Sequence, residues 1–176
     1  MTEDIHTKDQ RLRKVIDFLK DNWFDDQAGL VCAGLFDHVN EAIASSTTPA
    51  TGKWIHAERN AVEKFFQTFG RPSSNAIMIT TLSPCVVSSS SRVGESCTNL
   101  LISERIHSVH SGILDTLQKD SLLIYQANDI VFTTSEDSYC VRTCTNLLKL
   151  FERFGSRVNR ELPDIKKSFP LSEVFS

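Results

Sequence analysis

Three side chains in this sequence have the types and the spacing of metal ligands. His56 opens one predicted helix, Cys85 follows a predicted strand, and Cys97 opens the next predicted helix. One imidazole and two thiolates form a zinc ligand set that leaves the fourth tetrahedral position for water, which is the catalytic arrangement. Helix N-termini favour the negative charge of the thiolates. These residues therefore predict a catalytic zinc centre.

Glu58 lies two residues after His56 and is the acid–base group that such a centre needs. A carboxylate at that position can reach the water of a zinc centre without binding the metal. Zinc lowers the pKa of this water, and the carboxylate can take a proton from it and deliver the proton to a leaving amine. The pattern therefore predicts a zinc-assisted hydrolytic reaction, with Glu58 as the catalytic residue.

The pattern of apolar side chains predicts the elements that position these residues. Helical spacing predicts helices over residues 8–25, 55–69 and 139–154, and Ser96 is a typical N-cap for a further helix over 97–105. Short apolar runs predict a hairpin over 29–45 and strands over 76–82, 106–112 and 129–133. Helices and strands in this order predict an α/β fold, a three-layer α/β/α sandwich around a mixed sheet of about five strands.

The length of 176 residues suits a single domain. We expect this domain to cover residues 1–158 and a charged, proline-punctuated tail over 159–176 to lie on its surface. No apolar stretch approaches the ~20 residues that span a bilayer, and Met1–Gln10 contains no apolar signal region. We therefore expect a cytoplasmic protein without a membrane partner.

Five cysteines, an odd number, fit reduced thiols and metal ligands better than disulfides in that compartment. Cys97 has a competitor as the third zinc ligand, because the sequence Cys-Thr-Asn-Leu-Leu at 97–101 recurs at 144–148. On spacing alone, Cys144 can also open a helix. Cys97 is favoured because it follows Pro84-Cys85 within one loop, whereas two predicted strands separate that loop from Cys144.

The combination of His56-x-Glu58, Pro84-Cys85 and Cys97 resembles the H-x-E…P-C-x-x-C signature of the zinc-dependent cytidine deaminase superfamily. The resemblance covers residues 30–110, in the order hairpin, helix, strand, Pro-Cys, helix and strand. It implies that the histidine and the two cysteines hold Zn²⁺ and that Glu58 shuttles the proton. Eleven residues separate Cys85 from Cys97, where the family usually has two. A widened gap is also typical of the pyrimidine deaminases of riboflavin synthesis.

Four residues are candidates for substrate binding. Trp54 can stack on a base or pack in its own loop against the hairpin, and both interpretations stay open. The resemblance also implies a substrate-binding Asn about eleven residues before the motif histidine in several relatives, and the nearest position here is around Thr47 or Thr48. Ala57 lies inside the His-x-Glu motif, and the turn at Pro84 can present backbone groups to the amine. The serine-rich insertion over 86–96 is either a lid over the site or a surface insertion.

The expected function is hydrolytic deamination of a free amino-pyrimidine or a related nucleobase, nucleoside or nucleotide, because the chain is small and has a net charge of −3. One alternative is a deaminase of tRNA or single-stranded DNA, which needs a basic track for phosphates. That track can come from Arg153, Arg157, Arg160, Lys166 and Lys167. A second alternative is an inactive zinc-binding partner subunit. The resemblance also implies a homo-oligomer.

Overall fold

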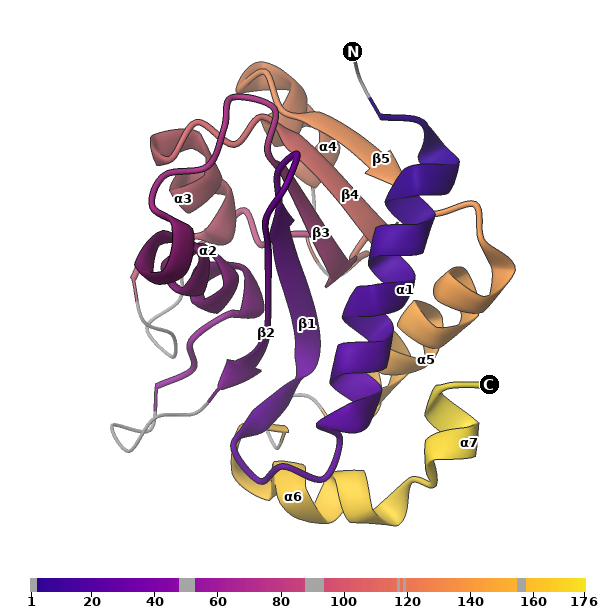
Figure 1. The fold of residues 1–176 in the computed structure, drawn as a ribbon. Coiled ribbons are helices and arrows are strands. Elements are labelled where there is room, and N and C mark those ends of the chain that lie inside the picture. The colour runs from indigo at the N-terminus through magenta and orange to yellow at the C-terminus, as the bar shows by residue number, and fades with distance from the viewer. Residues whose placement is uncertain (1–2, 48–52, 88–93, 117, 119, 155–157) are drawn as a thin grey trace.

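A five-stranded mixed sheet forms the central layer of the fold, with the strand order β2-β1-β3-β4-β5 (Figure 1). The computed structural model describes residues 3–47, 53–87, 94–116, 118, 120–154 and 158–176, without the side chains of 158–161. β1 pairs antiparallel with β2 and β3, whereas β3, β4 and β5 are parallel. The predicted mixed sheet is confirmed. The strands are β1 (Ala28–Phe36), β2 (Glu41–Thr47), β3 (Ile77–Leu82), β4 (Ser108–Ile113) and β5 (Val131–Thr134).

Helices cover both faces of this sheet (Figure 1). Helices α2, α3 and α4 pack on one face and α1 and α5 on the other, so the predicted three-layer sandwich is confirmed. Among the described residues, no helix combines the length and the apolar character needed to cross a membrane. The helices are α1 (Ile5–Asp21), α2 (Ala57–Phe69), α3 (Cys97–Ser103), α4 (Ser121–Ala127), α5 (Ser138–Phe154), α6 (Val158–Ser168) and α7 (Leu171–Val174).

Local sequence explains where several of these elements begin and end. The side chain of Asp37 accepts hydrogen bonds from the backbone N–H groups of Val39 and Asn40 (3.0 and 2.8 Å), which closes the β1–β2 hairpin. Helix α2 ends at Gly70, whose φ of +79° is a conformation that glycine adopts readily. Helix α4 was not predicted from the sequence. Its leucines, Leu122 and Leu123, are exposed, so it has no apolar stripe to detect.

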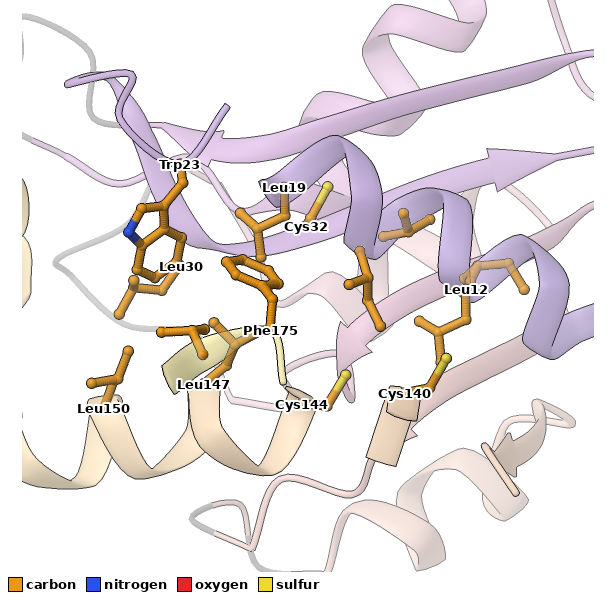
Figure 2. Close-up of a cluster of buried hydrophobic side chains, with 14 of the residues drawn as sticks. Leu12, Leu19, Trp23, Leu30, Cys32, Cys140, Cys144, Leu147, Leu150 and Phe175 are labelled. Carbon is orange, nitrogen blue, oxygen red and sulfur yellow. The ribbon is translucent and has the colours of Figure 1, made fainter. Parts of the chain in front are cut away.

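The face of the sheet under α1 and α5 carries the larger group of buried side chains, which we call the α1/α5 cluster. Figure 2 shows labelled residues of both helices, including Cys140 and Cys144, pointing into this cluster. Those two thiols and Cys32 are each 0% exposed. These cysteines therefore pack as small apolar side chains. The cluster contains Leu12, Leu19, Trp23, Leu30, Cys32, Cys140, Cys144, Leu147, Leu150 and Phe175, among others.

The C-terminal segment differs from the surface tail expected over 159–176. It forms helices α6 and α7, and four of its apolar side chains are buried: Leu162, Ile165, Val174 and Phe175. The ring of Phe175 meets the ring of Trp23 edge-on, with 5.3 Å between centroids. The apolar spacing in this segment is interrupted by charges and by Pro163 and Pro170, which explains why the sequence alone suggested a tail.

Candidate zinc centre

The N-terminus of α2 positions His56. This residue is the N-cap of the helix, with an extended backbone, and its side chain makes no capping hydrogen bond. The preceding residue, Ile55, forms a two-way backbone bridge with Thr47 at the end of β2, with both N···O distances 2.9 Å. Asn60, one turn into α2, donates to Ser45 O and Thr47 Oγ1. The end of β2 is thus fixed to the helix start, which positions the imidazole of His56.

The segment after β3 and the start of α3 position the two cysteines. Ser96 caps α3, because its hydroxyl accepts from Asn99 N (3.2 Å), as the sequence predicted. Thr98 donates its backbone N–H and its hydroxyl to the carbonyl of Cys85, at 3.1 and 2.9 Å. The backbone N–H of Cys97 donates to the sulfur of Cys85 (3.2 Å). The first turn of α3 is therefore tied directly to the Pro84-Cys85 turn.

The three predicted ligands converge on one point. Their ligand atoms all lie within 4.8 Å of one another. His56 Nδ1 is 3.7 Å from Cys85 Sγ and 3.3 Å from Cys97 Sγ. Tetrahedral zinc with ordinary bond lengths would hold a nitrogen and a sulfur ligand roughly 3.6 Å apart. The donor set and its spacing therefore fit zinc, and the described residues contain no second group of this kind.

The thiol of Cys85 is poised for metal binding. A hydrogen bond from the Cys97 side chain, together with one from His56, lowers the pKa of Cys85 to about 4. The same interaction with Cys85, together with burial, raises the pKa of Cys97. The lowered pKa favours the thiolate form of Cys85, which is the form that binds zinc.

Glu58 lies beside the three candidate ligands, in the first turn of α2, and its side chain is 2% exposed. Burial raises the pKa of this carboxyl group, and the nearby His56 opposes that effect. Among the described residues, nothing forms a hydrogen bond with its Oε2 atom. A buried carboxylate oxygen without a hydrogen-bond partner destabilises the folded state. This cost is removed when a bound molecule donates a hydrogen bond to the oxygen, so the position of Glu58 suits a residue that contacts a ligand.

A set of supporting residues was not identified from the sequence. Tyr125 on α4 donates its hydroxyl to the carbonyl of Pro84. The hydroxyl of Ser83 accepts a hydrogen bond from the backbone N–H of Asp115 (2.8 Å). The side chain of Gln118 accepts a hydrogen bond from the backbone N–H of Val86 (2.8 Å) and donates one to the Asp115 carboxylate. These contacts fix the turn that carries Cys85 from residues more than thirty positions away. No local sequence signal marks such long-range contacts.

The other predicted site residues occupy varied environments. Trp54 is 8% exposed and belongs to the α1/α5 cluster, so little of its ring is available to a substrate, and this favours the packing interpretation. Ala57 is fully buried, and the carbonyl of Pro84 is bound by Tyr125. Thr48 lies outside the described residues, as do residues 88–93 of the serine-rich insertion. The competing Cys144 lies in the α1/α5 cluster, while Cys97 joins His56 and Cys85.

Residues 8–113, more than half of the chain, match the family model of the cytidine and deoxycytidylate deaminase zinc-binding region. The fold is similar to that of a diaminohydroxyphosphoribosylaminopyrimidine deaminase/5-amino-6-(5-phosphoribosylamino)uracil reductase from Thermotoga maritima. The TM-score is 0.65 at 18% identity, with 87% of this chain and 42% of that chain covered. A similar fold occurs in dCMP deaminase from the cyanophage S-TIM5, with a TM-score of 0.53 at 15% identity and with 75% of this chain and 99% of that chain covered. Guanine deaminase from Nitrosomonas europaea is also similar, with a TM-score of 0.55 at 15% identity and with 87% of this chain and 86% of that chain covered. No curated protein sequence matches the chain.

The chain therefore belongs to the cytidine and deoxycytidylate deaminase family, and its cofactor is zinc. The matched region contains all three candidate ligands and Glu58. At 15–18% identity the solved structures establish the shared fold alone. The chain also spans less than half the length of the Thermotoga maritima protein.

Proposed function

We propose that this protein is a zinc-dependent hydrolytic deaminase of a free amino-pyrimidine or a related nucleobase, nucleoside or nucleotide. The position of Glu58 is the observation that carries the proposal. Its carboxylate is buried, has an oxygen without a partner among the described residues, and adjoins three residues whose ligand atoms fit zinc. A purely structural zinc site has no need of a buried carboxylate beside its ligands.

In this mechanism His56, Cys85 and Cys97 hold the metal, and zinc supplies the Lewis-acid chemistry that activates water near neutral pH. Glu58 accepts one proton from the water and delivers it to the exocyclic nitrogen. The water oxygen bonds to the ring carbon, the carbon–nitrogen bond breaks, and the amine leaves as ammonia. Burial of Glu58 keeps bulk water away from the proton that it carries.

The structure supports a small substrate over a nucleic acid, because the proposed basic track is incomplete. Lys166 is 2% exposed and donates to two backbone carbonyls, so it is not available to bind phosphate. The guanidinium of Arg153 lies over the rings of Phe154 and Phe169, at 5.4 and 5.6 Å from the ring centroids. Arg157 and the side chain of Arg160 lie outside the described residues.

The proposal also includes a cytoplasmic location, a role in nucleotide metabolism and assembly into a homo-oligomer. All five cysteines are free thiols, which is typical of a reducing compartment. The family resemblance supports the metabolic role and the oligomer. Sedimentation of the zinc-loaded protein will give the oligomeric state.

The decisive experiment is ammonia release from a panel of cytosine, adenine and guanine bases, nucleosides, nucleotides and short single strands. We expect zinc-loaded wild type to turn over a monomeric compound. Glu58→Gln, which keeps the shape of the side chain, should lower kcat roughly 10²- to 10⁴-fold with zinc still bound. Glu63→Gln is a matched control, because Glu63 is exposed on the same helix. Turnover of single strands alone would support the nucleic-acid alternative, and no turnover with zinc bound would support the inactive subunit.

A further inference from the structure

Tyr125 on α4 has its ring in the core and its hydroxyl at the turn that carries Cys85. The side chain is 1% exposed, and its ring stacks on that of Phe132 on β5, with 4.9 Å between centroids and 22° between ring planes. Its hydroxyl donates to the carbonyl of Pro84. Phenylalanine would serve for packing alone, because a buried hydroxyl costs free energy unless it is hydrogen-bonded. The use of tyrosine here therefore depends on the Pro84 carbonyl.

The contact acts on the peptide unit that precedes Cys85. The carbonyl of Pro84 and the N–H of Cys85 belong to one planar group, so a hydrogen bond to this carbonyl restrains the whole plane. In the following peptide unit, the carbonyl of Cys85 accepts from Thr98, at 3.1 and 2.9 Å from its backbone nitrogen and its hydroxyl. The N–H of Val86, in the same unit, donates to Gln118 (2.8 Å). With both flanking planes restrained, the direction of the Cα–Cβ bond of Cys85 is restrained as well.

This restraint is supplied from α4, which has few other buried side chains. Ser121 and Tyr125 are the buried residues of this helix, whereas Leu122 and Leu123 are 50% and 64% exposed. The one large side chain that α4 buries is therefore the side chain that contacts the Pro84-Cys85 turn. Because the match to the family model ends at residue 113, this contact comes from a part of the chain beyond the matched region.

We propose that Tyr125 is a positioning residue for the deamination, because by holding the Pro84–Cys85 peptide unit it directs the sulfur of Cys85 toward the other two ligands. The effect on the reaction rests on the proposed deaminase function, whereas the effect on the metal site does not. Cys85 Sγ lies 3.7 Å from His56 Nδ1 and accepts from Cys97 N at 3.2 Å. A rotation of the peptide plane would alter both separations. Contacts that orient metal ligands typically change metal affinity or activity 10- to 100-fold.

The first test removes the hydroxyl and keeps the ring. Zinc affinity of Tyr125→Phe, measured by competition with a chromophoric chelator, should fall roughly 10- to 100-fold. The thiolate-to-metal absorption bands of the Co²⁺-substituted protein should also shift, because they report the position of the sulfur. Tyr139→Phe is the matched control. It removes the other tyrosine hydroxyl of the chain, on α5 against the α1/α5 cluster, and should leave both readouts unchanged.

Two further variants separate positioning from general stability. Phe132→Leu loosens the packing of the Tyr125 ring and keeps the hydroxyl, so it should lower the urea midpoint and leave the Co²⁺ bands in place. Replacing Tyr125 with 4-aminophenylalanine keeps a donor on the same ring. It should restore most of the zinc affinity, and it tests the contact even if Tyr125→Phe folds poorly.

Activity is a separate readout. In zinc-saturated Tyr125→Phe, kcat for the compound found in the ammonia-release panel should fall about tenfold, and KM should change less than about threefold. Weakened zinc affinity and shifted Co²⁺ bands in a protein that deaminates nothing would support the positioning of Cys85 and contradict the deaminase. If Tyr125→Phe kept the zinc affinity and Co²⁺ bands of wild type, or changed them only as much as Phe132→Leu, the positioning role would be overturned.

Discussion

The sequence Cys-Thr-Asn-Leu-Leu occurs twice in the chain, and its two copies have different environments. At 97–101 the cysteine opens α3, and its sulfur lies 3.3 Å from His56 Nδ1. At 144–148 the same five residues lie in the interior of α5, where Cys144 is 0% exposed among apolar side chains. A first helical turn offers backbone N–H groups without helical partners, whereas the interior of a helix offers none. Cys97 therefore lies with His56 and Cys85, whereas Cys144 lies among apolar side chains in the α1/α5 cluster, without a second potential ligand group among the described residues.

The side chains after each cysteine confirm that the local sequence does not fix its partners. Thr98 donates to the carbonyl of Cys85 and supports the metal centre, whereas Thr145 donates to Val141 O, one turn back in its own helix. Asn99 N binds the capping Ser96. The side chain of Asn146 instead donates to two carbonyls of α7, at 3.0 and 3.3 Å. Residues 97–101 therefore support the candidate site, and residues 144–148 bind helix α7 to helix α5.

The largest predicted difference between the copies is in metal content. Cys97→Ala should reduce bound zinc from about one ion per chain to a small fraction and abolish turnover, because only two ligands remain. Cys144→Ala should keep zinc and lose about 1–2 kcal/mol of unfolding free energy, because it only leaves a small cavity. Metal analysis after gel filtration and urea unfolding give the two quantities. If Cys144→Ala lost its zinc and Cys97→Ala kept it, the assignment of the third ligand would be reversed.

Truncation in the α1/α5 cluster should affect stability and leave the zinc centre intact. Phe175→Ala should lower the free energy of unfolding by about 3 kcal/mol, because Phe175 is 6% exposed and packs edge-on against Trp23. The control is Phe24→Ala, since Phe24 is 61% exposed and should change stability by less than about 0.5 kcal/mol. Urea unfolding followed by intrinsic fluorescence measures both. Equal, small effects would mean that residues 159–176 are a surface tail after all.

Much of the fold could be predicted because buried faces of helices and strands are marked by a pattern of apolar residues in the sequence. The stripe on α1 and the apolar runs of β1 and β3 are clear because these elements pack over most of their length. The choice of Cys97 over Cys144 followed from its closeness in sequence to Cys85, and the distances agree. Helix α4 and the C-terminal helices were missed, because one has exposed leucines and the others have prolines and charges among their buried residues.

The supporting contacts of the candidate site could not be predicted from the sequence, for a different reason. Tyr125, Ser83 and Gln118 act through pairings between residues far apart in the chain. The types of these residues are common in any loop or short helix.

A smaller effect tests how tightly the second copy packs. A Cβ atom at Gly112 on β4 would lie 2.1 Å from the sulfur of Cys144 and 2.9 Å from Thr81 O. Gly112→Ala should therefore cost about 2–3 kcal/mol of unfolding free energy. Cys144→Ala in the same chain should recover part of that cost, and a double-mutant cycle in urea measures the coupling. Strict additivity would mean that the contact with the Thr81 carbonyl, not Cys144, causes the destabilisation.

A pH-dependent effect concerns Lys166, which attaches α6 beside Trp23 in the same region. Its ammonium group donates to Ala28 O (2.8 Å) and Asp25 O (3.3 Å), and burial lowers the pKa of Lys166 to about 8 from 10.5. Between pH 8 and 10.5 the unfolded chain therefore binds one proton more than the folded chain at this site, so stability should rise with pH across that window.

Lys166→Met removes this titration while keeping an unbranched side chain against Trp23. Relative to the variant, wild type should gain about 2–3 kcal/mol of unfolding free energy from pH 8 to pH 10.5. Urea unfolding at several pH values measures the difference in unfolding free energy between wild type and Lys166→Met. Groups that titrate equally in both proteins contribute nothing to this difference. Parallel pH profiles would show that the amine of Lys166 stays protonated in the folded protein, so that α6 is bound through a charged group.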